Sequence, residues 1–340
     1  MDGAVTGPSA GTPLRVGLLV DSLQQPAWVE RALRRVIESG AGSIHLVVMN
    51  DAARAPGQPA RSRLGTWWQN RRQLVYAAYM RLDQRKFGGG DSDPFAPRDI
   101  SGLVGSATVL GVTPRMTRHS DHVSVEDVDA IRATSPDVLI RLGFRILRGP
   151  ILGAARHGVW SYHHGDHQRY RGGPPCFWES MEGNPVTGTV LQQLTEELDD
   201  GRVLYRSFSA TNQFSVAKNR REVYWKGSEF IVRALLRLRA EGSAAPAPAA
   251  EVGPSAYSHR LYVAPSNREM APALARLAMR HVSKKCASLF RTSSGFWRGG
   301  AGRACLTTIA NLTWPPIGFM PCTRQRTASG RTPFPSVRRG

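Results

Sequence analysis

The residues best suited to chemistry lie at the end of a strand-like run and in a later turn. The run Gly158-Val-Trp-Ser-Tyr-His163 ends in a histidine, and an imidazole just past a strand end is a candidate general base. Leu198-Asp-Asp-Gly201 is a turn that leads into another strand and can bring the Asp199 carboxylate beside that imidazole. A neighbouring carboxylate raises the pKa of a histidine and fixes its tautomer. The pattern therefore indicates an acid–base site built on His163 and Asp199.

These residues also have ordinary structural explanations. His163 is alternatively a packed histidine, and Asp199 is alternatively a turn aspartate. His164, Asp166 and His167 look like a metal cluster, but three positions on one loop supply no convincing ligand set. The four cysteines match no zinc-binding spacing. We therefore expect a solvated loop at 164–167 and assign no metal.

The elements around this stretch predict a parallel sheet. Apolar runs at 15–21 and 44–50 indicate buried strands, and the helical spacing between them at 26–39 completes a βαβ unit. Further strands are expected at 109–112, 137–143, 158–163, 187–194 and 202–209. Further helices are expected at 66–85, 222–240 and 272–289, and one more begins at the capping box formed by Ser124 and Asp127. Such doubly wound α/β sheets bind ligands beyond the carboxyl ends of their strands.

Three ordered motifs resemble those of the formyltransferase family, whose enzymes use 10-formyltetrahydrofolate. Ser161-Tyr-His163 stands where the family has Asn-x-His, and Tyr170-Arg-Gly-Gly-Pro-Pro175 is similar to its Tyr-Arg-Gly-x-x-Pro. Leu198-Asp-Asp-Gly201 is similar to its Leu-Asp-x-Gly, and the 36 residues from His163 to Asp199 suit the family spacing. The resemblance is strong over about 135–210, weaker upstream and absent beyond about 240.

The resemblance implies a Rossmann-like formyltransferase fold and 10-formyltetrahydrofolate as cofactor. The segment 137–147 resembles the strand and loop that line the folate pocket of the family. The cofactor-binding residues implied in this way are Leu142, Gly143, Phe144, Ile146 and Leu198.

The implied reaction is acyl transfer, in which a substrate amine attacks the formyl carbon. His163 would polarise or protonate the tetrahedral oxygen, while Asp199 would orient His163 and take the proton of the amine. Ser161 replaces the family asparagine that donates a hydrogen bond to the developing oxyanion, and losing such a donor costs on the order of 10²–10³ in rate. The loop 164–168 also replaces the Pro-Ser-Leu-Leu-Pro loop of the family.

Two features that the sequence lacks limit which amine could accept the formyl group. The family member of the purine pathway has a glycine-rich phosphate-binding loop after its first strand, and residues 18–24 do not show such a loop. The family member that acts on initiator tRNA has a C-terminal β-barrel, and residues 241–340 show no strand pattern of that size. We therefore expect a small-molecule amine, an amino sugar or glycolipid precursor. The alternative function is that of a catalytically degenerate formyltransferase-like binding module of a larger glycan- or lipid-modifying protein.

The positive charge is concentrated near the C-terminus. The net charge is +19, and residues 252–340 hold 14 Lys and Arg side chains against one acid, Glu269. Such a block is typical of a solvated tail, so nucleic acid is not the expected partner. Binding of acidic polymers or lipid headgroups is the alternative interpretation.

The predicted organisation is a formyltransferase-like catalytic domain at 14–240 with a C-terminal extension. A disordered N-terminus (1–13), an Ala/Pro linker (241–260), a basic helical segment (261–290) and a disordered basic tail (291–340) complete it. No run approaches the roughly 18 apolar residues of a membrane span, and the polar N-terminus lacks signal-peptide character, so a cytoplasmic location is expected. The sequence does not indicate the oligomeric state.

Overall fold

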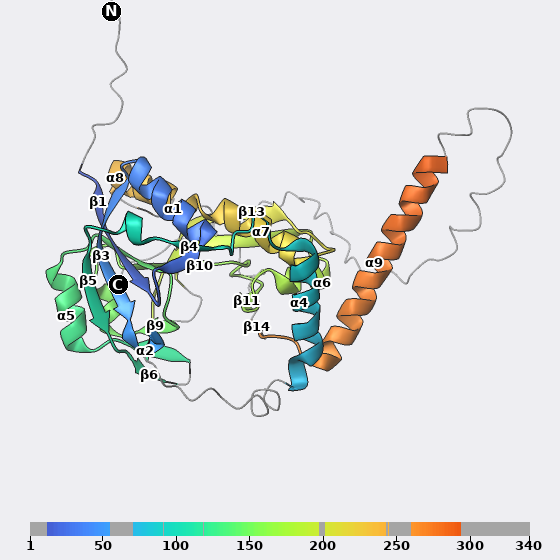
Figure 1. Cartoon of the computed structure of the whole chain (residues 1–340), viewed down its shortest axis with the longest axis horizontal. Coiled ribbons are helices and arrows are strands. Elements are labelled where there is room, and N and C mark those ends of the chain that lie inside the picture. Colours follow the sequence, from blue (N-terminus) through green and yellow to red (C-terminus); the bar gives the residue numbers. More distant parts are fainter. Residues whose placement is uncertain are drawn as a thin grey trace, which may run out of the picture. The chain divides into compact units, whose positions relative to one another are not determined.

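A seven-stranded mixed sheet forms the centre of the computed structural model, which describes residues 12–54, 71–90, 92–117, 119–196, 201–242, 244 and 260–293 (Figure 1). Its strands are β1 (Leu14–Val20), β3 (Gly42–Asn50), β5 (Thr108–Val112), β8 (Val138–Arg141), β10 (Val159–His163), β12 (Val186–Gln193) and β13 (Arg202–Ala210). Their spatial order is β13-β12-β10-β8-β1-β3-β5. Strands β10, β8, β1, β3 and β5 pair in parallel, whereas β12 and β13 are antiparallel to their neighbours.

Shorter elements complete the described chain. The short strands are β2 (Gln24–Pro26), β4 (Pro97–Asp99), β6 (Arg115–Met116), β7 (Ser120–His122), β9 (Ile146–Arg148), β11 (Arg171–Gly172) and β14 (Leu261–Tyr262). The α-helices are α1 (Ala27–Glu38), α2 (Asp51–Arg54), α4 (Leu74–Phe87), α5 (Val125–Ala133), α6 (Phe177–Glu182), α7 (Val216–Gly227), α8 (Phe230–Glu241) and α9 (Asn267–Ser293). Short 3-10 turns lie at η1 (Arg71–Gln73), η2 (Ser101–Leu103) and η3 (Pro150–Gly153).

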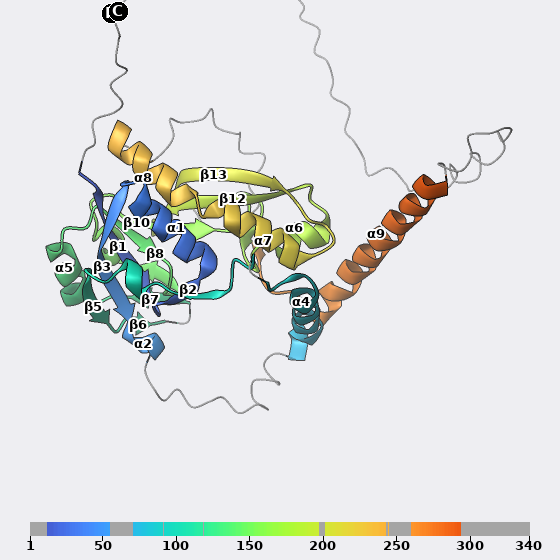
Figure 2. The ribbon, with the colours of Figure 1, turned by 45° about the horizontal axis from the view of Figure 1, so that its top comes forward.

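Two hydrophobic cores lie on opposite faces of the sheet. Val16, Leu18 and Val20 of β1 belong to the core under α1, α7 and α8, which lie together in Figures 1 and 2. Leu19 points the other way, into the core under α5 and η3. Successive side chains of a strand alternate between faces, so a nearly continuous apolar run feeds both cores. The predicted doubly wound α/β fold is confirmed.

Most predicted elements agree with the structure to within a few residues, but the helix expected at 222–240 is wrong as a single element. The chain forms α7 and α8 instead, with a turn at Ser228 and Glu229. The Ser228 hydroxyl donates to the Trp225 carbonyl oxygen, and its backbone N–H bonds to carbonyls of the last turn of α7. Because Ser228 satisfies the helix end, the chain can break there and pack both helices on the sheet. The start of the helix predicted at 66–85 lies outside the described residues.

After the predicted linker the chain packs again on the unit that contains the sheet. Strand β14 pairs in parallel with β11, and Met270 and Ala273 of α9 are buried against Phe177 and Trp178. Helix α4 lies beside the first part of α9 in both ribbon views, and the Val75 backbone N–H donates to Asn267 Oδ1 (Figures 1 and 2). Residues through Lys285 form one compact unit, and the unit 286–340 is described only as far as Ser293. The predicted domain limits remain predictions.

Candidate active site

A cavity of about 760 Å³ opens at the carboxyl ends of β8 and β10. Its walls come from β8 and β10, from the β9 strand, from the segment after β12, and from β14. The lining residues are Thr117, His119, Ser120, Arg141, Ile146, Leu147, Arg148, Ser161, Tyr162, His163, Gly172, Gln192, Leu194, Thr195, Glu196, Leu261, Tyr262 and Val263. The position agrees with the rule that open α/β sheets bind ligands beyond the carboxyl ends of their strands.

His163 and Ser161 line this cavity together because they lie two residues apart on β10 and share one face of the sheet. Nε2 of His163 lies 3.1 Å from the carbonyl oxygen of Tyr170. A carbonyl oxygen only accepts hydrogen bonds, so Nε2 carries a hydrogen. The Tyr170 carbonyl oxygen therefore holds the ring in one orientation through Nε2.

Ser161 is bonded to an arginine of the neighbouring strand. Its side chain is 1% exposed, and Arg141 Nε donates a 3.0 Å hydrogen bond to Ser161 Oγ. Arg141 Nη1 also donates to the carbonyl oxygens of Phe144 and Arg145, at 3.2 and 2.8 Å. The Ser161 hydroxyl thus sits beside a held positive charge.

The predicted partner of His163 cannot be placed. Asp199 and Leu198 lie outside the described residues, so their predicted roles stay predictions. The last described residue before them, Glu196, lines the cavity. Glu196 is held there because Arg148 donates to its carbonyl oxygen at 2.6 Å and the Gly149 N–H donates to its carboxylate at 2.8 Å.

The four other predicted folate contacts divide between the cavity and the protein interior. Ile146 lines the cavity. Leu142 packs against the core on the α1 side, and Phe144 is buried in the core on the α5 side. Gly143 lies against Asp21, whose carboxylate also accepts a 3.0 Å hydrogen bond from the Phe144 N–H. Their predicted contacts with folate stay predictions, and only Ile146 is among the side chains that line this cavity.

Sequence reasoning missed the wall formed by β14. Leu261, Tyr262 and Val263 line the cavity although they follow the predicted linker. The Gly173 N–H donates to the Tyr262 carbonyl oxygen at 2.9 Å, and Gly172 has a φ of +85°, a conformation that favours glycine. The Gly172-Gly173 pair signals a tight turn, but no sequence signal joins it to a strand some 90 residues away.

Two buried acidic side chains lie near His163, Asp166 in the loop after β10 and Glu179 on α6. Glu179 is 1% exposed and Asp166 is 8% exposed. Burial, together with the charges of Asp166 and Glu182, raises the pKa of Glu179 to about 7. Its Oε1 has no hydrogen-bond partner among the described residues. A β-carbon added at Gly165 would lie 3.1 Å from His163 Nε2 and 3.5 Å from Glu179 Oε1, so Gly165 lies next to both side chains.

The loop at 164–167 is not solvated as expected. The His164 ring stacks on Tyr224 with centroids 3.6 Å apart, and burial lowers its pKa well below the ordinary value. Helix α7 covers this loop, and packing against Tyr224 stabilises the His164 ring more than hydration would. Within the described ranges, no group of three or more His, Cys, Asp or Glu side chains is placed to hold a metal ion.

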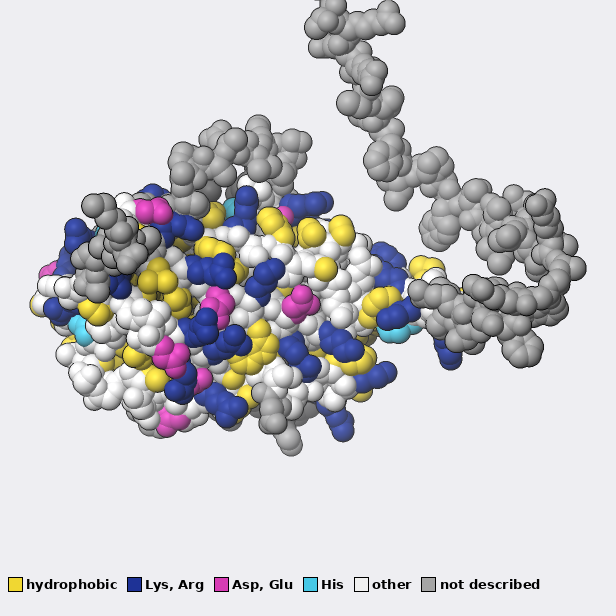
Figure 3. Space-filling model, turned by 90° about the horizontal axis from the view of Figure 1, so that it is seen from above, with side chains coloured by type: hydrophobic (Ala, Val, Ile, Leu, Met, Phe, Trp, Pro, Cys, Tyr) yellow, Lys and Arg dark blue, Asp and Glu magenta, His cyan; other side chains and the backbone are white. Residues whose placement is uncertain are grey.

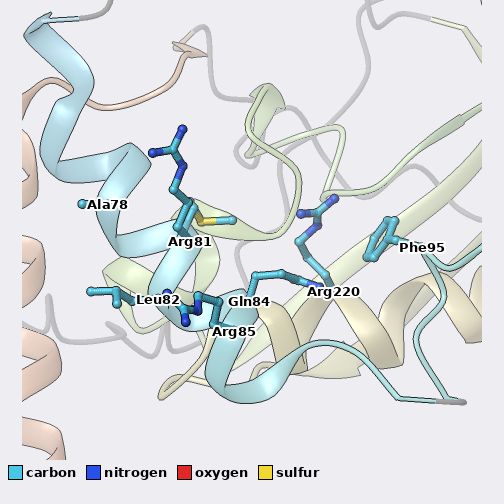
Figure 4. A pocket seen from close by; sticks show the side chains of 8 residues that line it. Ala78, Arg81, Leu82, Gln84, Arg85, Phe95 and Arg220 are labelled. Atoms are coloured by element: carbon cyan, nitrogen blue, oxygen red, sulfur yellow. The ribbon is translucent and has the colours of Figure 1, made fainter.

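A second hollow of about 870 Å³ lies at α4 and shares no lining residue with the first cavity. Figure 4 shows its lining, with Arg220 beside Phe95 at 4.2 Å from the ring centre. The described lining residues are Ala78, Met80, Arg81, Leu82, Gln84, Arg85, Phe95 and Arg220. They include neither a carboxylate nor an imidazole, so they offer no acid–base pair.

On the face seen in Figure 3, Lys and Arg side chains are scattered among acidic and hydrophobic ones. Among the helices that the structure describes, none is both long and apolar enough to span a lipid bilayer.

Comparison with known proteins finds a family similar to the segment that carries Ser161 and His163. Residues 106–234, which contain β8, β10 and the lining histidine and serine, match the family model described as formyl transferase. This segment of the chain, residues 106–234, is therefore similar to the formyltransferase family.

The similar proteins are named as follows. Methionyl-tRNA formyltransferase of Chlorobium phaeovibrioides is 32% identical over 128 residues, which are 36% of this chain and 40% of that protein. Methionyl-tRNA formyltransferase of Anaeromyxobacter dehalogenans is 40% identical over 76 residues, 22% of this chain and 24% of that protein. The matched segment therefore spans well under half of these relatives. Among solved structures, glycinamide ribonucleotide transformylase 1 from Symbiobacterium toebii is similar at a TM-score of 0.43 and 16% identity, covering 68% of this chain and 90% of that one.

Proposed function

We propose that this chain transfers a formyl group from 10-formyltetrahydrofolate to a substrate amine. The observation that carries the proposal is the placement of Ser161 and His163 in one cavity at the carboxyl end of β10, inside the segment that matches the family. The reaction class follows from the family, and the residues present supply the proton handling that acyl transfer needs.

The cavity suits a folate-sized ligand. Its volume of about 760 Å³ lies in the range of small-molecule sites. Ile146, Leu147 and Leu194 offer an apolar surface, and Gln192, Thr195 and Glu196 offer polar groups beside it. The donor, when bound, supplies the formyl carbon and an oxygen that becomes negatively charged during transfer.

His163 is proposed to stabilise that oxygen. With Nε2–H directed to the Tyr170 carbonyl, the ring is held in one orientation, and its proton at Nδ1 is the one available for transfer. Asp199 is proposed to orient His163 and to accept the proton of the attacking amine. Ser161 is proposed as a second donor to the oxygen.

The acceptor is proposed to be an amino sugar or a glycolipid precursor. The curated relatives are named for methionyl-tRNA, so the amine of a tRNA-linked methionine is the competing acceptor. A further candidate is a catalytically degenerate binding module, which the serine at position 161 favours because a serine hydroxyl is shorter than an asparagine amide.

The experiment is a calorimetric titration of the full chain with a stable formyl-folate analogue, followed by a transfer assay with labelled 10-formyltetrahydrofolate. Saturable binding, with labelled product from an amine panel of amino sugars and methionyl-tRNA, supports the enzyme. Binding of the analogue without release of the formyl group to water or its transfer to any amine supports the binding module. An absence of binding at millimolar analogue contradicts both.

A further inference from the structure

Arg141 and Ser161 are brought together by the register of the sheet. Strands β8 and β10 pair in parallel, and Arg141 lies directly beside Ser161 in that pairing. Both residues line the cavity. Their contact is the 3.0 Å hydrogen bond from Arg141 Nε to Ser161 Oγ.

The guanidinium group is fixed by further contacts. Arg141 Nη1 is held by the carbonyl oxygens of Phe144 and Arg145, in the loop that follows β8. Nε and Nη1 lie in one rigid plane, so bonds at both atoms restrict the orientation of the whole group. The hydrogen bond to Ser161 is therefore made by a guanidinium group whose rotation is restricted.

This donor decides what the serine hydroxyl can do. A free serine hydroxyl rotates and either donates or accepts, whereas a guanidinium has only donors. Ser161 Oγ must accept from Arg141, which leaves its hydrogen to be donated elsewhere. Among the described residues its hydrogen reaches only the carbonyl oxygen of the next residue, Tyr162, at 3.5 Å, the outer limit of a hydrogen bond.

We propose that Arg141 is a positioning residue that commits the Ser161 hydroxyl to donate into the cavity. The inference rests on the proposed function, because the group that receives this hydrogen bond is the formyl oxygen of the donor. The fixed positive charge also makes the serine hydroxyl a stronger donor, since charge-assisted hydrogen bonds polarise the chain of bonds they belong to. Arg141 acts through Ser161.

The simpler explanation is that Arg141 only secures the loop at 144–145. The two explanations differ in what they predict for a ligand that lacks the formyl group. A purely structural role affects the formyl-bearing and the formyl-free ligand alike. A role through Ser161 affects only the part of the affinity that the formyl group contributes.

The experiment measures the affinities of the full chain for a stable formyl-folate analogue and for the same analogue without its formyl group. The ratio of the two dissociation constants gives the contribution of the formyl group. The ratio is determined for the native chain, Arg141→Met, Ser161→Ala and the double variant. We expect each single variant to lower it about tenfold, as losing one good hydrogen bond does, and the double variant to lower it no further.

Arg141→Lys and Arg148→Met extend the test. Lysine keeps the charge but not the planar donor pair, so we expect a partial loss of the ratio, and this variant remains informative if Arg141→Met does not fold. Arg148 lines the same cavity but bonds to Glu196, so its variant should change both affinities together.

Four outcomes overturn the inference. Equal weakening of both ligands in Arg141→Met assigns the residue a structural role. Losses that multiply in the double variant show that Arg141 and Ser161 act independently. If the native chain binds neither ligand, the proposed function fails and the inference fails with it, whereas formyl-dependent binding unchanged in both single variants overturns the inference alone.

Discussion

The imidazole of His163 is tied to the backbone of Tyr170, with 3.1 Å between Nε2 and the carbonyl oxygen. Tyr170 is itself fixed, because its backbone N–H bonds to the Asp166 carbonyl oxygen at 2.7 Å and its hydroxyl lies 3.1 Å from Glu182. The loop between β10 and β11 therefore sets the orientation and the tautomer of the histidine at the same time. A side chain held in this way loses little orientational freedom when it takes part in a reaction.

His163→Ala is expected to reduce formyl transfer by about 10²–10⁴, the usual contribution of a positioned acid–base group. His163 is only partly buried, so the thermal unfolding midpoint should change little. The rate is measured in single turnover with labelled 10-formyltetrahydrofolate. His281→Ala on α9, which is not a lining residue of the cavity, is the control. Equal rates for the two variants would contradict a role for His163.

Asp199→Asn is expected to reduce the rate as strongly as His163→Ala, because the amide cannot accept the amine proton. Asp200→Asn, one residue further along the sequence, is the matched control and should retain transfer. Dissociation constants for the formyl-folate analogue are measured alongside the rates. Comparable losses in both variants would show that this segment has a general structural role and that Asp199 is not a specific base.

Glu179→Gln is expected to stabilise the fold at neutral and alkaline pH. Burial raises the pKa of Glu179 from its usual 4.5 to about 7, so the folded state binds this proton more tightly than the unfolded state does. Below about pH 4.5 Glu179 is protonated in both the folded and the unfolded state. Between about pH 4.5 and pH 7 the free energy of unfolding falls as the pH rises. Above pH 7 the full cost of burying the ionised carboxylate, about 3 kcal/mol, is present.

The measurement is urea unfolding of the native chain and of Glu179→Gln at several pH values. The variant should gain stability at pH 8 and differ little at pH 4.5, where both side chains are neutral. Since Glu179 lies beneath the His163 loop, the pH dependence of folding should flatten in the variant. A stability difference that is the same at both pH values would show that Glu179 is not protonated on burial.

Gly172→Ala is expected to separate β14 from β11. The glycine has a φ of +85°, and an added β-carbon would lie 2.3 Å from the Tyr262 carbonyl oxygen. The backbone must shift there, at a cost of roughly 1–3 kcal/mol in the free energy of unfolding, and the cavity should lose its Tyr262 wall. Gly153→Ala is the control, because its φ is not positive and no atom lies within 4 Å of the added β-carbon. Analogue affinity that falls equally in both variants would argue against β14 as a wall of the site.

Much of the scaffold could be predicted from the sequence because its signals are local. The apolar runs of β1, β3 and β8 are set by their own side chains, and Ser124 caps α5 by accepting from the Asp127 N–H, as the capping box predicts. His163 and Ser161 could be placed at a strand end for the same reason. Helix α9 was expected to begin near 272 but begins at Asn267, where Ser266 and Glu269 form a capping box of their own.

Other features depend on contacts that no local signal contains. The loop of His164 and Asp166 looks polar in the sequence, yet Tyr224 from α7 buries the imidazole and covers the loop. Glu179 likewise has an elevated pKa only because α6 is packed under that loop.

The amino-acid sequence by itself determined the strands, most of the helices and the presence of Ser161 and His163 on one strand, because hydrophobic period and capping act over a few residues. The tertiary structure alone decided that Arg141 holds Ser161 and that Tyr262 closes the cavity. The register of β8 and β10 brings together Arg141 and Ser161, which lie 20 residues apart, and the pairing of β11 with β14 joins residues about 90 apart. Such pairings depend on the packing of the whole domain.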